Sequence, residues 1–209
     1  MPIVRRLTDS CVVLSTDNGA TLIDPGFHTF DSTEIDLASI GDIQRVLITH
    51  EHGDHVKPEF VAWLVDRGED VGVYANDAVA AMLATHEIAV ETGNPQGVSS
   101  QDVLHEKIPT GAQPPNRSFT VEGVITHPGD SQQPTHSAPV LALPLLAPWT
   151  SMTSAIDFAR RLEPAQVVPI HDFYTSASGR QWIMGVGKAV LAADGIEVVA
   201  LDWGESYSL

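Results

Sequence analysis

A cluster of metal-binding residue types directly after a β-branched run constrains this chain more than any other sequence feature. The run is RVLITH at residues 45–50, and the cluster is THEHGDH at residues 49–55, which packs three histidines and two carboxylates into seven positions. The run predicts a short strand, and Gly53 permits a tight turn beyond it. Because alternate side chains of a strand point the same way, the imidazoles of His50 and His52 can reach one point. The cluster therefore predicts a metal site at a strand end.

A second ion could bind beside the first, because Asp54 and His55 follow directly after the turn. Imidazole and carboxylate groups are the ligands that zinc favours, and manganese, iron and nickel also accept them. Cys11 is the only cysteine, so the chain can build neither an internal disulfide nor a thiolate cluster. The ligand types therefore predict a divalent metal ion, with zinc as the first choice, and leave room for a second ion beside it.

Strand and helix patterns alternate along most of the chain, which favours an α/β or α+β domain with layered sheets. The sequence Asp17-Asn18-Gly19 predicts an early hairpin. Between Glu91 and Arg117, proline, glycine, serine and glutamine are frequent, and we expect loops there around the short run 102–108. The expected strands are residues 3–7, 11–16, 20–26, 45–50, 71–76, 119–127, 140–145, 165–171 and 196–201, and the expected helices are residues 58–68, 77–88, 150–163 and 178–195. We expect one domain over residues 1–209.

Composition narrows the classes of partner. The chain has 27 acidic and 11 basic residues and a formal charge of −16, which repels phosphate backbones and anionic membranes. We therefore expect a small-molecule substrate and no nucleic acid partner. The N-terminus, MPIVRRLTDSCVVL, lacks the features of a secretory signal, and the longest apolar runs fall short of a membrane span. We expect a cytoplasmic protein without a membrane partner; a homo-oligomer stays open.

The segment at residues 50–55, HEHGDH, resembles the HxHxDH signature of the metallo-β-lactamase superfamily. This resemblance implies an α+β fold, a four-layer αββα sandwich of two mixed β-sheets flanked by helices. It also implies an aspartate that closes an early strand, which Asp24 in TLIDPG matches. An aspartate that bridges two metals matches Asp130 in HPGDS, and a final histidine after the last core strand matches His171 in VVPIHD.

The third histidine of the first metal follows a different pattern from many superfamily members, which carry it in a GHTPG-like stretch. The chain is more similar to the L-ascorbate-6-phosphate lactonase-like branch, in which a histidine on a strand precedes a GD motif by roughly one hairpin. His105 in DVLHE is the best match, and FTVEGVITHPGDS supplies the hairpin that leads to Asp130. The resemblance thus extends from Asp24 to His171.

The resemblance and the spacing together imply a role for each residue. One metal would be held by His50, His52 and His105, the other by Asp54, His55 and His171, with Asp130 bridging them. Two such ions can lower the pKa of a shared water toward about 7 and supply hydroxide at neutral pH. Asp54 would accept or shuttle a proton, and Asp24 would orient a ligand imidazole.

Several other polar and aromatic residues could lie near the site, and for some of them the sequence leaves two interpretations open. His127 either lines the pocket or is structural, and His28 either reaches the mouth of the site or faces solvent. We expect Glu51 and Glu106 to point away from the metals, because each adjoins a ligand histidine on a strand. The remaining candidates are His86 and His136, expected on the surface, and Trp149, Phe173 and Tyr174, which either form an apolar wall for substrate or pack in the ordinary way.

These features predict a metal-dependent hydrolase whose hydroxide attacks an ester, lactone, amide or phosphoester of a small molecule. A phosphodiesterase or tRNA-processing nuclease of the same superfamily is the alternative enzyme, and the charge of −16 argues against it. A non-catalytic metal-binding or sensing module is a second alternative. A third is an oxidoreductase, because the superfamily includes di-iron members.

Overall fold

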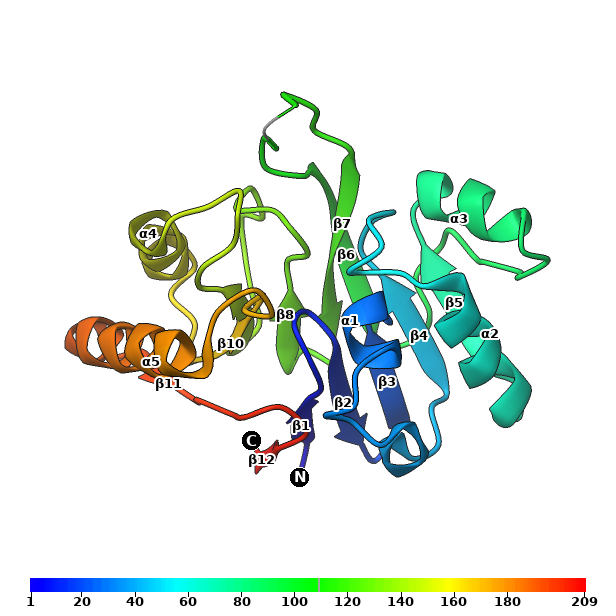
Figure 1. Ribbon diagram of the computed structural model, residues 1–209, viewed down its shortest axis with the longest axis horizontal. Coiled ribbons are helices and arrows are strands. Elements are labelled where there is room, and N and C mark those ends of the chain that lie inside the picture. The colour runs from blue at the N-terminus through cyan, green and yellow to red at the C-terminus, as the bar shows by residue number, and fades with distance from the viewer. Residues whose placement is uncertain (109) are drawn as a thin grey trace.

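Two six-stranded β-sheets form the centre of the computed structural model, which describes residues 1–108 and 110–209. Figure 1 shows them between two groups of helices. The first sheet has antiparallel pairing from β12 to β3 and parallel pairing from β3 to β5. In spatial order its strands are β12 (Ser206–Ser208), β1 (Ile3–Arg6), β2 (Val12–Thr16), β3 (Gly19–Ile23), β4 (Arg45–Ile48) and β5 (Gly72–Ala75).

The second sheet is mixed as well. Pairing is parallel from β11 to β8 and antiparallel from β8 to β6. Its strands in spatial order are β11 (Glu197–Val198), β10 (Gln166–Ile170), β9 (Val140–Pro144), β8 (Ile125–His127), β7 (Pro115–Val121) and β6 (Val98–Leu104).

Helices cover the outer faces of both sheets. The α-helices are α1 (Phe27–Phe30), α2 (Pro58–Arg67), α3 (Asp77–Ala84), α4 (Met152–Leu162) and α5 (Ala177–Leu191), and the 3₁₀ helices are η1 (Leu37–Ile40) and η2 (Ala192–Asp194). Local signals set their ends: Pro58 begins α2, and the N–H of Gly68 caps it. None of the helices in the described ranges is long and apolar enough to cross a membrane.

Three hydrophobic clusters account for the four layers. One joins the first sheet to α2 and α3 through residues such as Leu22 and Phe60. A second fills the space between the sheets, where Ile23 and Phe119 are fully buried. The third joins the second sheet to α4 and α5. Because both faces of each sheet are covered, the central strands β4 and β9 are almost wholly buried. The expected four-layer αββα sandwich of two mixed sheets is confirmed.

Chain direction brings distant segments to one edge of this sandwich. In the first sheet β1, β3 and β4 run the same way, and in the second sheet β6, β8, β9 and β10 do. The segments that follow their carboxyl ends therefore gather at one rim, as ligand-binding loops do in open α/β sheets. His50, His105, Asp130 and His171 all lie on such segments.

Two sequence expectations differ from the structure. The region 91–117, expected to be loops around a short run at 102–108, also contains the longer strand β6 and the start of β7, which form a hairpin whose register runs from Val98↔Val121 to Leu104↔Pro115. Strand β6 lies at the sheet edge and carries polar side chains, so it lacks a buried hydrophobic face that a pattern could reveal. The strand expected at 196–201 is limited to Glu197–Val198, and the chain then leaves to form β12 beside β1.

Candidate metal centre

The histidine-rich loop, residues 49–55, is held in place by the turn that follows β3. Asp24 lies at the end of this strand, and its carboxylate accepts hydrogen bonds from the backbone N–H and the hydroxyl of Thr49, both at 2.8 Å. The N–H of Phe27 donates to the carbonyl of Gly53 at 2.9 Å. Gly26 packs so closely against the histidine-rich loop that a Cβ at this position would lie 1.7 Å from the carbonyl oxygen of Asp54. The two segments therefore act as one packed unit at the rim.

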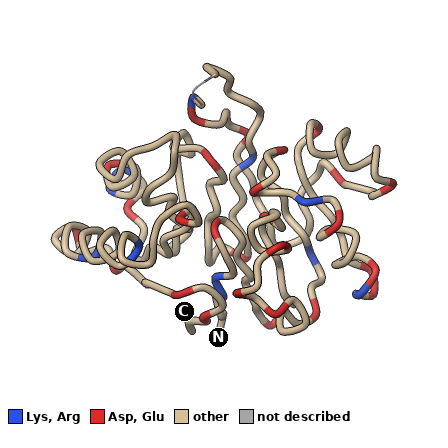
Figure 2. Tube along the Cα trace, viewed as in Figure 1, with Lys and Arg blue, Asp and Glu red and all other residues tan. Residues whose placement is uncertain are grey.

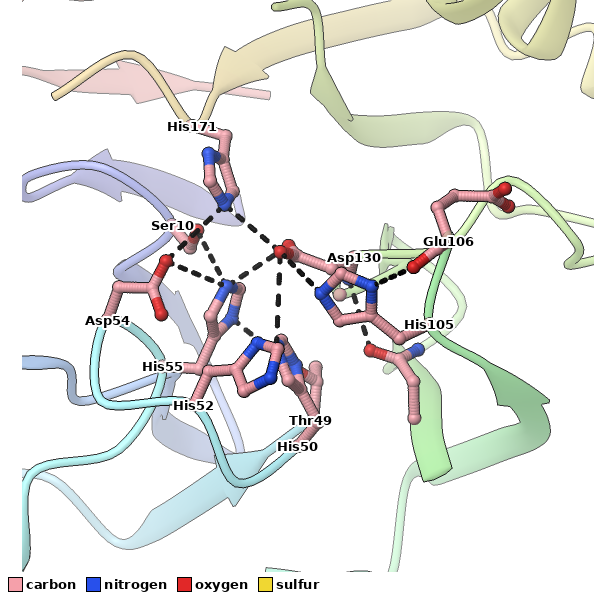
Figure 3. A network of polar contacts seen from close by, with 12 residues as sticks. Ser10, Thr49, His50, His52, Asp54, His55, His105, Glu106, Asp130 and His171 are labelled. Carbon is pink, nitrogen blue, oxygen red and sulfur yellow. Dashed lines mark hydrogen bonds and ion pairs between the residues drawn. The ribbon is translucent and has the colours of Figure 1, made fainter. Parts of the chain in front are cut away.

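One group of side chains has the geometry of a metal site. Its ligand atoms all lie within 4.8 Å of one another, and the group consists of His50, His52, His105 and Asp130. His50 Nε2 is 3.1 Å from His52 Nδ1, and His105 Nε2 is 3.2 Å from Asp130 Oδ2. Figure 3 shows His105 approaching Asp130 from the second sheet, on the side opposite the histidine-rich loop. These four residues come from three separate stretches of chain.

A second group shares the same aspartate. It consists of Asp54, His55, Asp130 and His171, whose ligand atoms also lie within 4.8 Å of one another. Asp130 is 3.0 Å from His55 Nε2 and 3.2 Å from His171 Nε2, and Asp54 Oδ2 is 3.7 Å from His171 Nε2. All seven residues that the sequence nominated as ligands are therefore brought together, with Asp130 common to both groups (Figure 3).

The donor set fits divalent cations. Asp130 is 2% exposed, and His50, His55 and His105 are fully buried. Among the described residues, His105 Nε2 and Asp130 Oδ1 make no well-aligned hydrogen bond despite this burial, although the first lies 3.2 Å from Asp130 Oδ2 and the second 3.0 Å from His55 Nε2. Buried polar atoms without such a bond are costly unless another group satisfies them. A cation in each group would coordinate these atoms and the converging ring nitrogens, and nitrogen and oxygen donors of this kind suit zinc, iron or manganese.

Contacts behind the imidazoles fix their orientation. His55 Nδ1 lies 2.7 Å from Asp24 Oδ2, so this ring donates its Nδ1 proton to Asp24 and turns Nε2 toward Asp130 Oδ1, 3.0 Å away. His105 Nδ1 likewise donates to the carbonyl of Glu106. Partners of this kind hold metal-binding histidines in the required tautomer. The geometry therefore supports the orienting role expected for Asp24.

Burial and neighbouring charges shift the pKa values of several residues of the two groups. Burial lowers the pKa of His50 well below its usual value, and nearby imidazoles add to this effect. Burial also lowers the pKa of His171, but the carboxylate of Asp130 outweighs it and raises the pKa to about 9. Burial raises the pKa of Asp130, yet His171 and His55 together bring it well below the usual value. A cation would replace these protons as the partner of Asp130.

Sequence reasoning missed the loop between β1 and β2. Asp9 accepts a hydrogen bond from the backbone N–H of Phe173 at 3.1 Å, and its Oδ1 is 3.9 Å from His171 Nδ1. Ser10 Oγ is 3.5 Å from His55 Nε2. An Asp-Ser pair between two short strands is typical of an ordinary turn. Only the three-dimensional arrangement, which places this turn at the same rim as the ligand groups, reveals that it adjoins the site.

The other histidines occupy structural or surface positions. His127 is buried, its Nε2 donates to the carbonyl of Ser10 at 2.8 Å, and its Nδ1 accepts from the N–H of Gly129 at 3.2 Å. Both ring nitrogens are thus engaged, and the structural reading of His127 is supported. His28 is buried too, stacked on Phe173 with ring centroids 3.7 Å apart. His86 and His136 are exposed, as expected.

Two glutamates and one tryptophan adjoin the ligand residues in sequence or in space. Glu51 is exposed and belongs to neither ligand group. The carboxylate of Glu106 accepts from the N–H of Gln132 and points away from the ligand groups, as expected (Figure 3). The indole of Trp149 faces both ligand groups, with its centroid 5.7 Å from those of His105 and His171. This aromatic ring therefore lines the rim beside the site.

Comparison with known proteins agrees with the fold. The family model described as Metallo-beta-lactamase superfamily matches residues 4–171. Protein Rv0786c of Mycobacterium tuberculosis is 29% identical over 188 residues, which cover 82% of this chain and 84% of that protein. A metallo hydrolase of the archaeon Ignicoccus hospitalis superposes with a TM-score of 0.72 at 16% identity, over 100% of this chain and 99% of the other. CmlA, a diiron β-hydroxylase of Streptomyces venezuelae, superposes with a TM-score of 0.67 at 12% identity, over 100% and 54%.

Proposed function

Because the chain belongs to the metallo-beta-lactamase superfamily, we propose that it is a metal-dependent hydrolase with two divalent cations at the rim of its sandwich. The observation that carries the proposal is the sharing of one buried carboxylate, Asp130, by two groups of ligand atoms. Such sharing is the arrangement needed to keep two cations close together. A single structural ion would leave one group of donors without a partner.

Each group supplies three residues of its own. His50, His52 and His105 would hold the first cation, and Asp54, His55 and His171 the second, with Asp130 between them. When bound, such a pair of ions lets water ionise near neutral pH and polarises a carbonyl or phosphoryl oxygen. Zinc is the proposed metal, and iron is the alternative because the structurally similar CmlA is a diiron enzyme.

Asp54 is the proposed proton acceptor. Its side chain is 20% exposed, whereas that of Asp130 is 2% exposed, so Asp54 can exchange a proton with solvent. Its Oδ2 lies 3.8 Å from His55 Nε2 and 3.7 Å from His171 Nε2. A carboxylate at this position can take a proton from an attacking water and pass it to the leaving group.

The substrate proposed is a small molecule with an ester, lactone, amide or phosphoester bond. The charge of −16 disfavours polynucleotides, which argues against a nuclease. The position of His105 at the end of β6, one hairpin before Asp130, supports assignment to the L-ascorbate-6-phosphate lactonase-like branch.

Elemental analysis joined to turnover measurements tests the proposal. We expect about two divalent ions per chain and hydrolysis of at least one member of a panel of lactones, thioesters, β-lactams and phosphodiesters. His50→Ala should lower both metal content and turnover, because it removes a buried ligand of the first group. Unchanged metal content in this variant would exclude the ligand assignment, and full metal content without any turnover would favour a non-catalytic module.

Asp54→Asn separates proton transfer from metal binding. We expect kcat to fall by about 10²–10⁴-fold while the first group retains its cation. Glu51→Gln is the matched control, because Glu51 is exposed in the same loop and belongs to neither ligand group. Wild-type turnover in Asp54→Asn would remove Asp54 from the mechanism.

A further inference from the structure

A cavity of about 270 Å³ opens beside His171. Its walls come from two loops, one after β9 and one after β10, which are parallel neighbours whose carboxyl ends meet. The lining residues are Leu146, Ala147, Pro148, His171, Tyr174 and Thr175. The cavity therefore shares a wall with the second ligand group. A larger cavity of about 570 Å³ lies against α5, and none of the ligand residues lines it.

The walls of the smaller cavity are apolar apart from His171 and two hydroxyl groups. Leu146, Ala147 and Pro148 contribute aliphatic surface, and Tyr174 presents a ring that is 71% exposed at the mouth. A volume of 270 Å³ lies just below the usual range of whole small-molecule sites, which is about 300–1,000 Å³. The cavity thus has room for one part of a ligand whose remainder reaches the metal centre.

Basic side chains near the site are engaged elsewhere. Arg6 forms a buried ion pair with Asp172, and Lys57 pairs with Asp31. The guanidinium of Arg180 lies 4.1 Å from the ring centroid of Trp203 and donates to the backbone carbonyl of Thr175 at 3.2 Å, so its charge is held outside the cavity wall. Figure 2 shows acidic residues outnumbering basic ones along the chain. Within the described part of the chain, no lysine or arginine lines this cavity. Among the described lining residues only His171 can carry a positive charge, and its Nε2 already faces Asp130 Oδ2 at 3.2 Å, so an anionic group would enter the cavity at a high desolvation cost.

We propose that this cavity binds the uncharged, apolar portion of the substrate. The inference rests on the proposed hydrolase function and narrows its substrate class to neutral esters, lactones or amides with an alkyl or aryl group. The reacting carbonyl would lie at the metal centre, while its apolar substituent is buried against Ala147 and Pro148. Phosphorylated substrates, which the lactonase-like branch would imply, fit the cavity poorly.

Binding of neutral amides to the metal-free protein tests the cavity without turnover. Ligand-observed NMR should show that hexanamide binds at least about tenfold more tightly than acetamide, because each buried methylene favours binding. Ala147→Phe should abolish this preference by filling the cavity. Ala200→Phe, the same change in the wall of the larger cavity, should preserve it. Equal affinity for the two amides in the wild type would overturn the proposal.

Two further measurements separate the cavity from the fold and from the hydrolase proposal. Tyr174→Ala removes a ring that is largely exposed, so it should fold normally and weaken hexanamide binding several-fold; unchanged binding would count against the cavity. With zinc-loaded protein, the kcat/KM for p-nitrophenyl hexanoate is compared with that for p-nitrophenyl acetate. The ratio of these two values should fall in Ala147→Phe and stay unchanged in Ala200→Phe. Retained hexanamide preference with no turnover of any ester, lactone or amide would support the cavity and contradict the hydrolase function.

Discussion

Asp24 accepts a hydrogen bond from His55, with Oδ2 2.7 Å from Nδ1, beneath the candidate metal centre. The same carboxylate accepts both hydrogen bonds from Thr49, so a single side chain fixes the end of β4 and the tautomer of one imidazole. Asp24 has a φ of 57°, a left-handed conformation that aspartate and asparagine tolerate better than most residues. This carboxylate therefore ties the end of β3 to both Thr49 and His55 in the histidine-rich loop.

Replacing Asp24 by asparagine should weaken binding of the second cation. Asparagine keeps the left-handed backbone, but its amide nitrogen replaces one of the two acceptor oxygens, so His55 or Thr49 loses its partner. We expect zinc affinity to fall about 10–100-fold, the usual effect of losing an orienting carboxylate. Competition with a chromogenic chelator measures it. Asp70→Asn is the control, because Asp70 is exposed with a φ of 56°; equal affinities in the two variants would argue against the orienting role.

His105→Ala should remove one cation and leave the other. His105 Nε2 belongs to the first ligand group alone, whereas the second group keeps Asp54, His55, Asp130 and His171. We expect elemental analysis to show a decrease from about two zinc ions per chain to about one. His136→Ala is the matched control, because His136 is exposed and remote from both groups. Two ions retained in His105→Ala would show that another residue completes the first group.

The histidine-rich loop could be predicted because its information is local. His50 and His52 follow a strand that its β-branched residues reveal. Both lie in the loop beyond this strand, where their rings still meet, with His50 Nε2 3.1 Å from His52 Nδ1. Asp130 and His171 also follow strands with clear apolar patterns, β8 and β10. Identification of the superfamily then supplied the layers of the fold, which periodicity alone did not.

The parts of the fold and site that could not be predicted depend on contacts between segments far apart in the sequence. His105 directly follows β6, an edge strand with polar side chains, so only a short run at 102–108 could be recognised and not the full strand, even though the residue itself was nominated. Asp9 and Ser10 reach the site only because β1 runs parallel to β3, two strands away. Likewise β12 pairs with β1 across almost the whole chain length. Such long-range pairings follow from tertiary packing rather than local propensity.

The stability of the metal-free protein should fall as pH rises from about 6.5 to 9. Burial lowers the pKa of His171, but Asp130 outweighs it and raises the pKa to about 9 from a usual 6.5. Protonation of His171 therefore contributes stability that is fully present below pH 6.5 and is lost as pH passes through 9. The pKa of His55 is also raised: burial lowers it, but Asp130 and Asp24 outweigh this effect, so His55 acts in the same direction.

Thermal unfolding across this window provides the measurement. We expect the Tm of the metal-free protein to fall by several degrees, since each kcal/mol shifts Tm by about 2–4 °C in a domain of this size. Zinc-loaded protein should show a smaller decrease, because a bound cation already holds the imidazole neutral. A His171→Gln variant should flatten the metal-free profile. A Tm that rises with pH in this range would contradict the proposed coupling of His171 to Asp130.

Gly26→Ala should disturb the metal centre through packing alone. A methyl group at this position would lie 1.7 Å from the carbonyl oxygen of Asp54 and 2.9 Å from the backbone nitrogen of His55. The loop that carries both ligands must therefore shift, which we expect to cost about 1–3 kcal/mol in unfolding free energy. Zinc affinity should fall as well, because ligands displaced by a fraction of an ångström no longer share one ion.

Gly185→Ala is the matched control for this substitution. Gly185 lies within α5, and a Cβ there would meet nothing within 4 Å, so alanine should stabilise the helix by about 0.5–1 kcal/mol. Urea unfolding of the metal-free variants, followed by zinc titration, distinguishes the two outcomes. If Gly26→Ala kept wild-type stability and zinc affinity, the turn after β3 could not be the support that holds Asp54 and His55 in place.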